Sequence, residues 1–127
     1  MAPGVVLAQT VRDRSNPNFE LLQDNLRRLR AATDARGRRL EIIEMDVLPY
    51  QRSIDGERYV IPYTNAYLVN GAVIAPAVEA TDDERGFRIL EQAFPGREIV
   101  PVPSIAQAVG GGGLGCITQQ VPAGRPA

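Results

Sequence analysis

The sequence predicts an α/β protein, because short apolar segments of strand character alternate with two amphipathic stretches of helical period. The two halves of the chain also repeat one plan: an apolar strand, a polar turn, a capped helix with an early phenylalanine, a Gly-Arg pair and a second strand. Residues 5–38 thus parallel residues 73–97. Because such units bury their faces by stacking on neighbours, we expect one domain over residues 1–127, with repeat units at about 1–50 and 57–122.

The first unit is expected to form a strand and then a helix. Residues 4–10 are an apolar run of strand length. Asn16-Pro17 supplies a helix cap followed by a proline at the first helical position, and Gly37 is expected to end the helix. An apolar stripe at spacings of three and four marks the buried face; it comprises Phe19, Leu22, Leu26, Leu29 and Thr33.

A second strand is expected over residues 40–47, where apolar side chains alternate with Glu44 and Asp46. Carboxylates at alternate strand positions share one face of the strand. They either face water or hold a guanidinium group, and the sequence leaves both interpretations open.

The second unit is expected to open with a β-hairpin. Two apolar segments, 59–69 and 72–77, flank Asn70-Gly71, the pair that best tolerates the positive φ values of a tight hairpin turn. The preceding residues, 49–58, are polar and are expected to form a loop with a turn at Asp55-Gly56.

A capped helix and a strand then complete the unit. Thr81 and Glu84 have the spacing of a capping box, with two further acids at the positive end of the helix dipole. The helix is expected to end at Pro95-Gly96, and residues 98–102 to return as a strand. Its buried stripe comprises Phe87, Leu90 and Phe94.

The composition is that of a globular protein, with 44% hydrophobic residues, 23% charged residues and a net charge of −1. This balance favours neither a nucleic-acid partner nor a membrane, and no apolar run approaches the roughly 20 residues of a membrane span. The single cysteine excludes an internal disulfide and suits a reducing compartment. We therefore expect a cytoplasmic protein.

The densest glycine cluster, residues 110–113, lies just before the only cysteine, Cys116. Such a run forms either a flexible linker or a backbone surface that a ligand can approach closely. The spacing of a dinucleotide-binding motif is matched by Gly110, Gly112 and Gly115, but only about a dozen residues remain for the helix that this motif must open. Residues 116–118 have strand character. The cysteine is either a small buried side chain or a nucleophile at a glycine-lined turn.

The segment Gly-Gly-Gly-Gly-Leu-Gly-Cys-Ile-Thr-Gln-Gln-Val-Pro, residues 110–122, resembles the C-terminal active-site segment of agmatine deiminases. These enzymes are related to bacterial peptidylarginine deiminases in the guanidine-modifying pentein superfamily. The family usually has histidine immediately before the cysteine, where this chain has Gly115. Further similarity extends over the rest of the chain and covers about the last two-fifths of the family sequence; it includes residues 2–10 and 25–29, Tyr63-Thr64-Asn65, Asn70-Gly71 and Gly96-Arg97.

The resemblance implies a fold of five ββαβ units around a pseudo-fivefold axis, of which this chain would supply about two as a partial α/β propeller. It also implies a reaction without metal or cofactor, in which a cysteine thiolate attacks a guanidinium carbon. A histidine of a His-x-Asp motif acts as general acid and base, and carboxylates hold the substrate. These groups lie upstream in the family, and this sequence contains no histidine.

Carried over residue by residue, the resemblance assigns the nucleophile to Cys116. Gly111, Gly112 and Gly113 either shape the substrate pocket around the cysteine or form a tight structural turn. Asn65 is implied to lie on the active-site side and to contact substrate, although a turn or strand-end role fits its position equally well.

Two hypotheses follow. In the first, the chain is the nucleophile-bearing part of an agmatine deiminase, acting on a small guanidine such as agmatine only when joined to or complemented by an upstream chain. In the second, it is a non-catalytic module that pairs its strand edges in a homo-oligomer.

Overall fold

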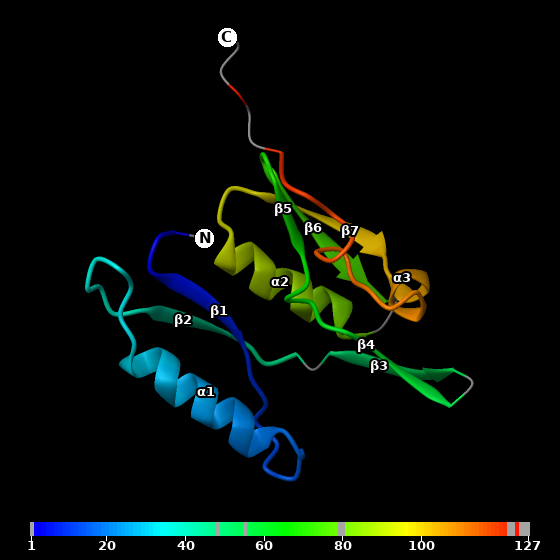
Figure 1. Ribbon diagram of the computed structural model, residues 1–127, viewed down its shortest axis with the longest axis horizontal. Helices are drawn as coiled ribbons and strands as arrows, with labels where there is room; N and C mark the ends of the chain where they lie inside the picture. Colours follow the sequence, from blue (N-terminus) through cyan, green and yellow to red (C-terminus); the bar gives the residue numbers. More distant parts are fainter. Residues whose placement is uncertain (1, 48, 55, 79–80, 122–123, 125–127) are drawn as a thin grey trace.

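Two parallel β-α-β crossovers form the body of the chain (Figure 1). The computed structural model describes residues 2–47, 49–54, 56–78, 81–121 and 124. In chain order the elements are β1 (Val5–Gln9), α1 (Phe19–Ala31), β2 (Glu41–Met45), β3 (Tyr50–Ile54), β4 (Glu57–Ile61), β5 (Tyr67–Val69), β6 (Ala72–Ala77), α2 (Asp83–Ala93), β7 (Glu98–Pro103) and α3 (Ile105–Val109). The α/β class expected from the sequence is confirmed.

The repeated plan of the two halves is also present in the structure. In the first, β1 pairs in parallel with β2, with Val5 opposite Glu41. In the second, β6 pairs in parallel with β7, with Val73 opposite Ile99, and β5 joins the other edge of β6 as an antiparallel strand. The hairpin turn has Gly71 at φ +78°, as the Asn-Gly pair predicts. The second half is therefore a strand-strand-helix-strand unit.

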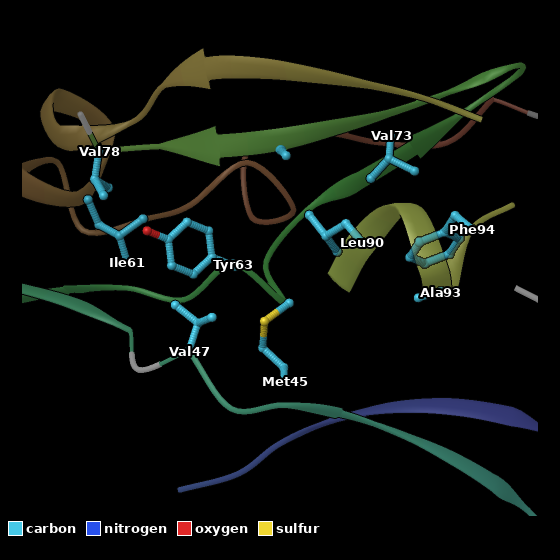
Figure 2. Packing of buried hydrophobic residues seen from close by; sticks show 10 residues of the cluster. Met45, Val47, Ile61, Tyr63, Val73, Val78, Leu90, Ala93 and Phe94 are labelled. Carbon is cyan, nitrogen blue, oxygen red and sulfur yellow. The ribbon is translucent and has the colours of Figure 1, made fainter. Parts of the chain in front are cut away.

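Helix α2 lies between the two halves (Figure 1), contacting β6 and β7 on one side and β2 on the other. One hydrophobic core consequently spans both halves and takes residues from β2, β4, β6, α2 and the positions just after each of them (Figure 2). Its buried members are Met45, Val47, Ile61, Tyr63, Val73, Ala75, Val78, Leu90, Ala93 and Phe94. Within the described part of the chain, no helix has the length and apolar character needed to cross a membrane.

The prediction of a polar loop over residues 49–58 is wrong. Strands β3 and β4 form an antiparallel hairpin there, with Gln51 opposite Val60. A polar sequence is compatible with this ribbon because β3 and β4 pair only with each other in the sheets that the structure describes. Gly56 has φ +84° and supports the predicted turn; Asp55 lies outside the described residues.

The continuous strand expected over residues 59–69 is interrupted in the structure. Pro62 follows β4, and its carbonyl oxygen accepts the Asn65 backbone N–H at 3.0 Å. Proline has no N–H to donate to a strand ladder, so the chain turns here before β5 begins. This turn, residues 62–65, separates two short strands.

Both ends of α1 differ from the sequence prediction. Asn18 is the N-cap, while the Asn16 side-chain oxygen accepts the Asn18 backbone N–H at 2.9 Å, upstream of the helix. The C-cap, Ala32, has extended backbone angles, so Thr33 lies outside the helix. Gly37 adopts φ +75° in the following turn rather than capping the helix, because Asp34 binds the Arg38 backbone and closes that turn.

The capping box predicted at Thr81 is also wrong. Asp82 is the N-cap of α2 and makes no side-chain capping bond. The next acid, Asp83, accepts hydrogen bonds from the Tyr63 hydroxyl at 2.8 Å and from the Val78 backbone N–H at 3.1 Å. This carboxylate therefore links the start of α2 to the turn before β5 and to the end of β6.

Tyr63 fills the space between α2 and the strands (Figure 2) and is 1% exposed. Its ring packs edge to face against Phe87, with centroids 6.3 Å apart. One residue before Phe87 in α2, a Cβ atom on Gly86 would lie 2.8 Å from Tyr63 Cδ1. Burial and the Asp83 contact raise the pKa of Tyr63, which keeps its hydroxyl protonated as a donor.

Substituting Gly86→Ala should lower the free energy of unfolding by about 1–2 kcal/mol, because overpacking against the Tyr63 ring outweighs the gain in helix propensity. Urea denaturation measures the change. Gln92→Ala, at an exposed position of the same helix, is the control and should be near neutral. Equal or greater stability of Gly86→Ala would show that Tyr63 does not need this space.

Candidate functional site

The glycine-rich segment follows helix α3 as a series of turns. The Gly111 and Gly112 backbone N–H groups donate to carbonyls of Ala108 and Gln107 in α3, and the Cys116 N–H donates to the Gly113 carbonyl at 3.0 Å. The strand expected over residues 116–118 is therefore wrong. The glycines also follow a helix rather than open one, which excludes the dinucleotide-binding interpretation.

A buried leucine anchors these turns to the domain. Leu114 is 5% exposed, and its carbonyl accepts the Thr118 hydroxyl at 2.7 Å. Sequence reasoning missed this anchor and also α3, whose five residues are too few for a clear helical period. Ser104 at the start of α3 was the available signal, although its hydroxyl donates to the Val102 carbonyl rather than capping the helix.

Cys116 is exposed and lies beside Asn65. The Asn65 amide nitrogen is 3.8 Å from Cys116 Sγ, and its side-chain oxygen accepts the Gly115 backbone N–H at 3.0 Å. The structure thus brings together two residues singled out in the sequence that are far apart along the chain. The interpretation of the cysteine as a small buried side chain is wrong.

Glycine occupies the positions around the cysteine for different structural reasons. Gly111 adopts φ +86°, a left-handed conformation that other residues rarely adopt. A Cβ atom on Gly113 would lie 2.8 Å from Asn65 Cγ, and closer still to its amide nitrogen. A Cβ on Gly115 would lie 2.5 Å from Asn65 Oδ1, whereas one on Gly112 would make ordinary contact with Cys116. The role of Gly115 was not predicted from the sequence.

The surroundings of Cys116 favour its thiolate. A backbone hydrogen bond with Gly113 and then the Asn65 side chain lower the pKa of the thiol, with a smaller opposing effect from desolvation. Because a thiolate is the nucleophilic form of cysteine, this environment makes the side chain more reactive near neutral pH.

Two acids of this segment, Glu44 in β2 and Asp46 just after it, are engaged with arginines of the chain. Glu44 pairs with Arg30 at 2.7 Å. Asp46 has a side chain only 7% exposed and holds Arg12 at 2.9 Å and Arg85 at 2.6 Å. Both carboxylates bind guanidinium groups of the chain's own arginines, and Glu44 is exposed to water as well. A role for either acid in holding a substrate guanidinium stays a prediction.

Among the described residues, no three histidine, cysteine, aspartate or glutamate side chains gather closely enough to hold a metal ion. A groove between α1 and the β3–β4 hairpin is lined by residues that include Gln9, Leu21, Leu22, Asn25, Gln51 and Val60. Neither Cys116 nor Asn65 lines this groove.

Comparison with known proteins gives consistent matches. A protein-family profile described as Porphyromonas-type peptidyl-arginine deiminase matches residues 1–122. Over 95% of its length the chain is 40% identical to a Selenomonas ruminantium protein named "Putative agmatine deiminase", of which it covers 38%. Over 98% of its length it is 35% identical to the agmatine deiminase of Pseudomonas aeruginosa strain LESB58, of which it covers 39%.

A solved structure extends the similarity to the fold. The agmatine deiminase of Enterococcus faecalis superposes on 95% of this chain with a TM-score of 0.86 and 28% sequence identity, and 38% of that protein is covered. The chain therefore spans less than two-fifths of the length of these relatives.

The rate at which iodoacetamide alkylates Cys116 should rise at a lower pH in the folded chain than in a synthetic peptide of residues 110–121. The peptide lacks Asn65 and the anchored turns that lower the pKa of the thiol. Because Cys116 is the only cysteine, loss of free thiol measures the reaction directly. Superimposed pH profiles would show that the fold does not activate this thiol.

Proposed function

Because the chain belongs to the Porphyromonas-type peptidyl-arginine deiminase family, we propose that it is the nucleophile-bearing part of an agmatine deiminase-like hydrolase. The observation that carries the proposal is the exposed Cys116 in its glycine-rich turns, with the Asn65 amide beside the sulfur. Relatives named as agmatine deiminases support agmatine as the substrate.

In the proposed reaction, the Cys116 thiolate attacks the guanidinium carbon of agmatine. A C–S bond forms, a C–N bond breaks and ammonia leaves after accepting a proton, which gives a thiouronium intermediate on the cysteine. Water then adds to the same carbon and displaces the thiol, releasing N-carbamoylputrescine. The atoms balance without a metal or an organic cofactor.

The sequence contains no histidine that could carry out the proton transfers of this reaction. The general acid and base must move a proton to the leaving nitrogen and take one from water. The two carboxylates considered from the sequence for guanidinium binding, Glu44 and Asp46, are bound to arginines of the chain. We therefore expect catalysis to require groups joined to this chain or supplied by a complementing chain.

The architecture proposed for the active form is a pentein-type propeller, in which this chain contributes about two ββαβ units. The unit formed by β5, β6, α2 and β7 supports this proposal, as does the incomplete pairing of the two-stranded β1–β2 sheet. The remaining units would complete the active site around Cys116. A cytoplasmic location, which suits a single reduced cysteine, is part of the same proposal.

A second candidate is a non-catalytic module that assembles with copies of itself. Large apolar side chains that share one groove favour it: Leu21 at 67% exposed and Val60 at 47% exposed both line the groove between α1 and the β3–β4 hairpin, and such groups mark association surfaces when they lie together. Sedimentation of the chain as a strict monomer at micromolar concentration would remove this candidate.

A chimera tests the primary proposal. The matched 38% of the Enterococcus faecalis enzyme would be replaced by this chain, and ureido product and ammonia would be measured with agmatine. We expect no turnover from the chain alone, turnover from the chimera and loss of at least about 10³-fold in the Cys116→Ala chimera.

Two outcomes would contradict the proposal. One is a folded chimera that is inactive under conditions where the parent enzyme is active. The other is activity that survives Cys116→Ala. An active isolated chain would instead show that the general base comes from a residue other than histidine.

A further inference from the structure

The Asn65 side chain uses both of its polar atoms on the cysteine turn. Its oxygen accepts the Gly115 backbone N–H at 3.0 Å, and its nitrogen lies 3.8 Å from Cys116 Sγ. Because a backbone N–H can only donate, it fixes which end of the amide faces it. The amide NH₂ group is therefore directed at the sulfur, where it can donate to a thiolate.

The residues facing Asn65 leave room for this arrangement. Side-chain atoms on Gly113 or Gly115 would occupy the space of the Asn65 amide, at 2.8 Å from its Cγ and 2.5 Å from its Oδ1 respectively. The backbone at these two positions is not in the left-handed region. Space for Asn65, rather than backbone conformation, thus accounts for glycine at these two positions.

The position of Asn65 is fixed from the other side by the core. It ends the turn over residues 62–65, where its own N–H donates to the Pro62 carbonyl at 3.0 Å. Tyr63, within the same turn, is buried and bonded to Asp83 of α2. The amide is consequently held by the fold as well as by its contacts with the cysteine turn.

We propose that Asn65 is a positioning residue that orients Cys116 and stabilises its thiolate by donating a hydrogen bond from its amide. Gly113 and Gly115 leave the space that this contact needs. The proposal rests on the proposed function of Cys116 as nucleophile. It assigns Asn65 a role toward the enzyme's own sulfur, beyond the substrate contact expected from the sequence. Its consequence is that the amide polarity of Asn65, not only its size, sets the reactivity of the cysteine.

Three variants of the chain separate these effects through the pH profile of Cys116 alkylation. Asn65→Ala removes the donor and should move the profile to higher pH by about half a pH unit or more. This shift corresponds to a reactivity at pH 7 that is about threefold lower. Asn65→Asp keeps the size and the acceptor for Gly115 but places negative charge at the sulfur, so its shift should be larger. Gly115→Ala should displace the amide and resemble Asn65→Ala.

Gly124→Ala is the matched control, because no described residue other than its chain neighbours has an atom within 4 Å of a Cβ at that position. Its profile should equal that of the unsubstituted chain. Circular dichroism establishes that each variant is folded. Unshifted profiles for folded Asn65→Ala and Gly115→Ala would overturn the proposal, as would an Asn65→Asp shift smaller than that of Asn65→Ala. Alkylation requires no turnover, so the pH profiles can be interpreted even if the deiminase chimera is inactive. An active chimera would likewise not decide the role of Asn65.

Discussion

The bond between Tyr63 and Asp83 determines how the candidate site is placed in this fold. Asp83 opens α2, accepts the Tyr63 hydroxyl and the Val78 N–H, and so holds the turn before β5 against the helix. The buried ring requires the absence of a side chain at Gly86. Two residues beyond Tyr63, Asn65 reaches Cys116. Because buried polar contacts are costly to lose, this bond makes the position of Asn65 a property of the core.

The same helix also joins the two halves of the chain. Arg85 of α2 and Arg12, which follows β1, both bind Asp46 at the end of β2. Loss of either partner would leave a carboxylate with only 7% exposure less well compensated. Next to it, Met45 and Val47 enter the core shared with α2 (Figure 2). The halves therefore form one packed body, with the cysteine turn on the half that contains β5, β6 and β7.

Local signals predicted the features that depend on few residues, such as the two β-α-β segments and the Asn70-Gly71 hairpin. They failed where contacts between distant segments determine the local structure. Asp83 looked like a helix-start acid, yet it binds Tyr63 from another element. The polar stretch expected as a loop instead contributes to β3 and β4, which pair with each other as a two-stranded ribbon. At the site, the family resemblance identified Cys116 and Asn65 separately. Their contact, and the reason for Gly115, depend on the packing of segments 50 residues apart.

In the proposed function, Cys116 is the nucleophile of a guanidine hydrolase once the remaining catalytic groups are present. The most direct measurement is mass spectrometry of the Enterococcus faecalis chimera, quenched in acid during turnover of agmatine. The peptide containing Cys116 should gain the mass of agmatine less ammonia, and the adduct should disappear when substrate is exhausted. Product formation with no adduct on Cys116, or with the adduct on another residue, would contradict this role of Cys116.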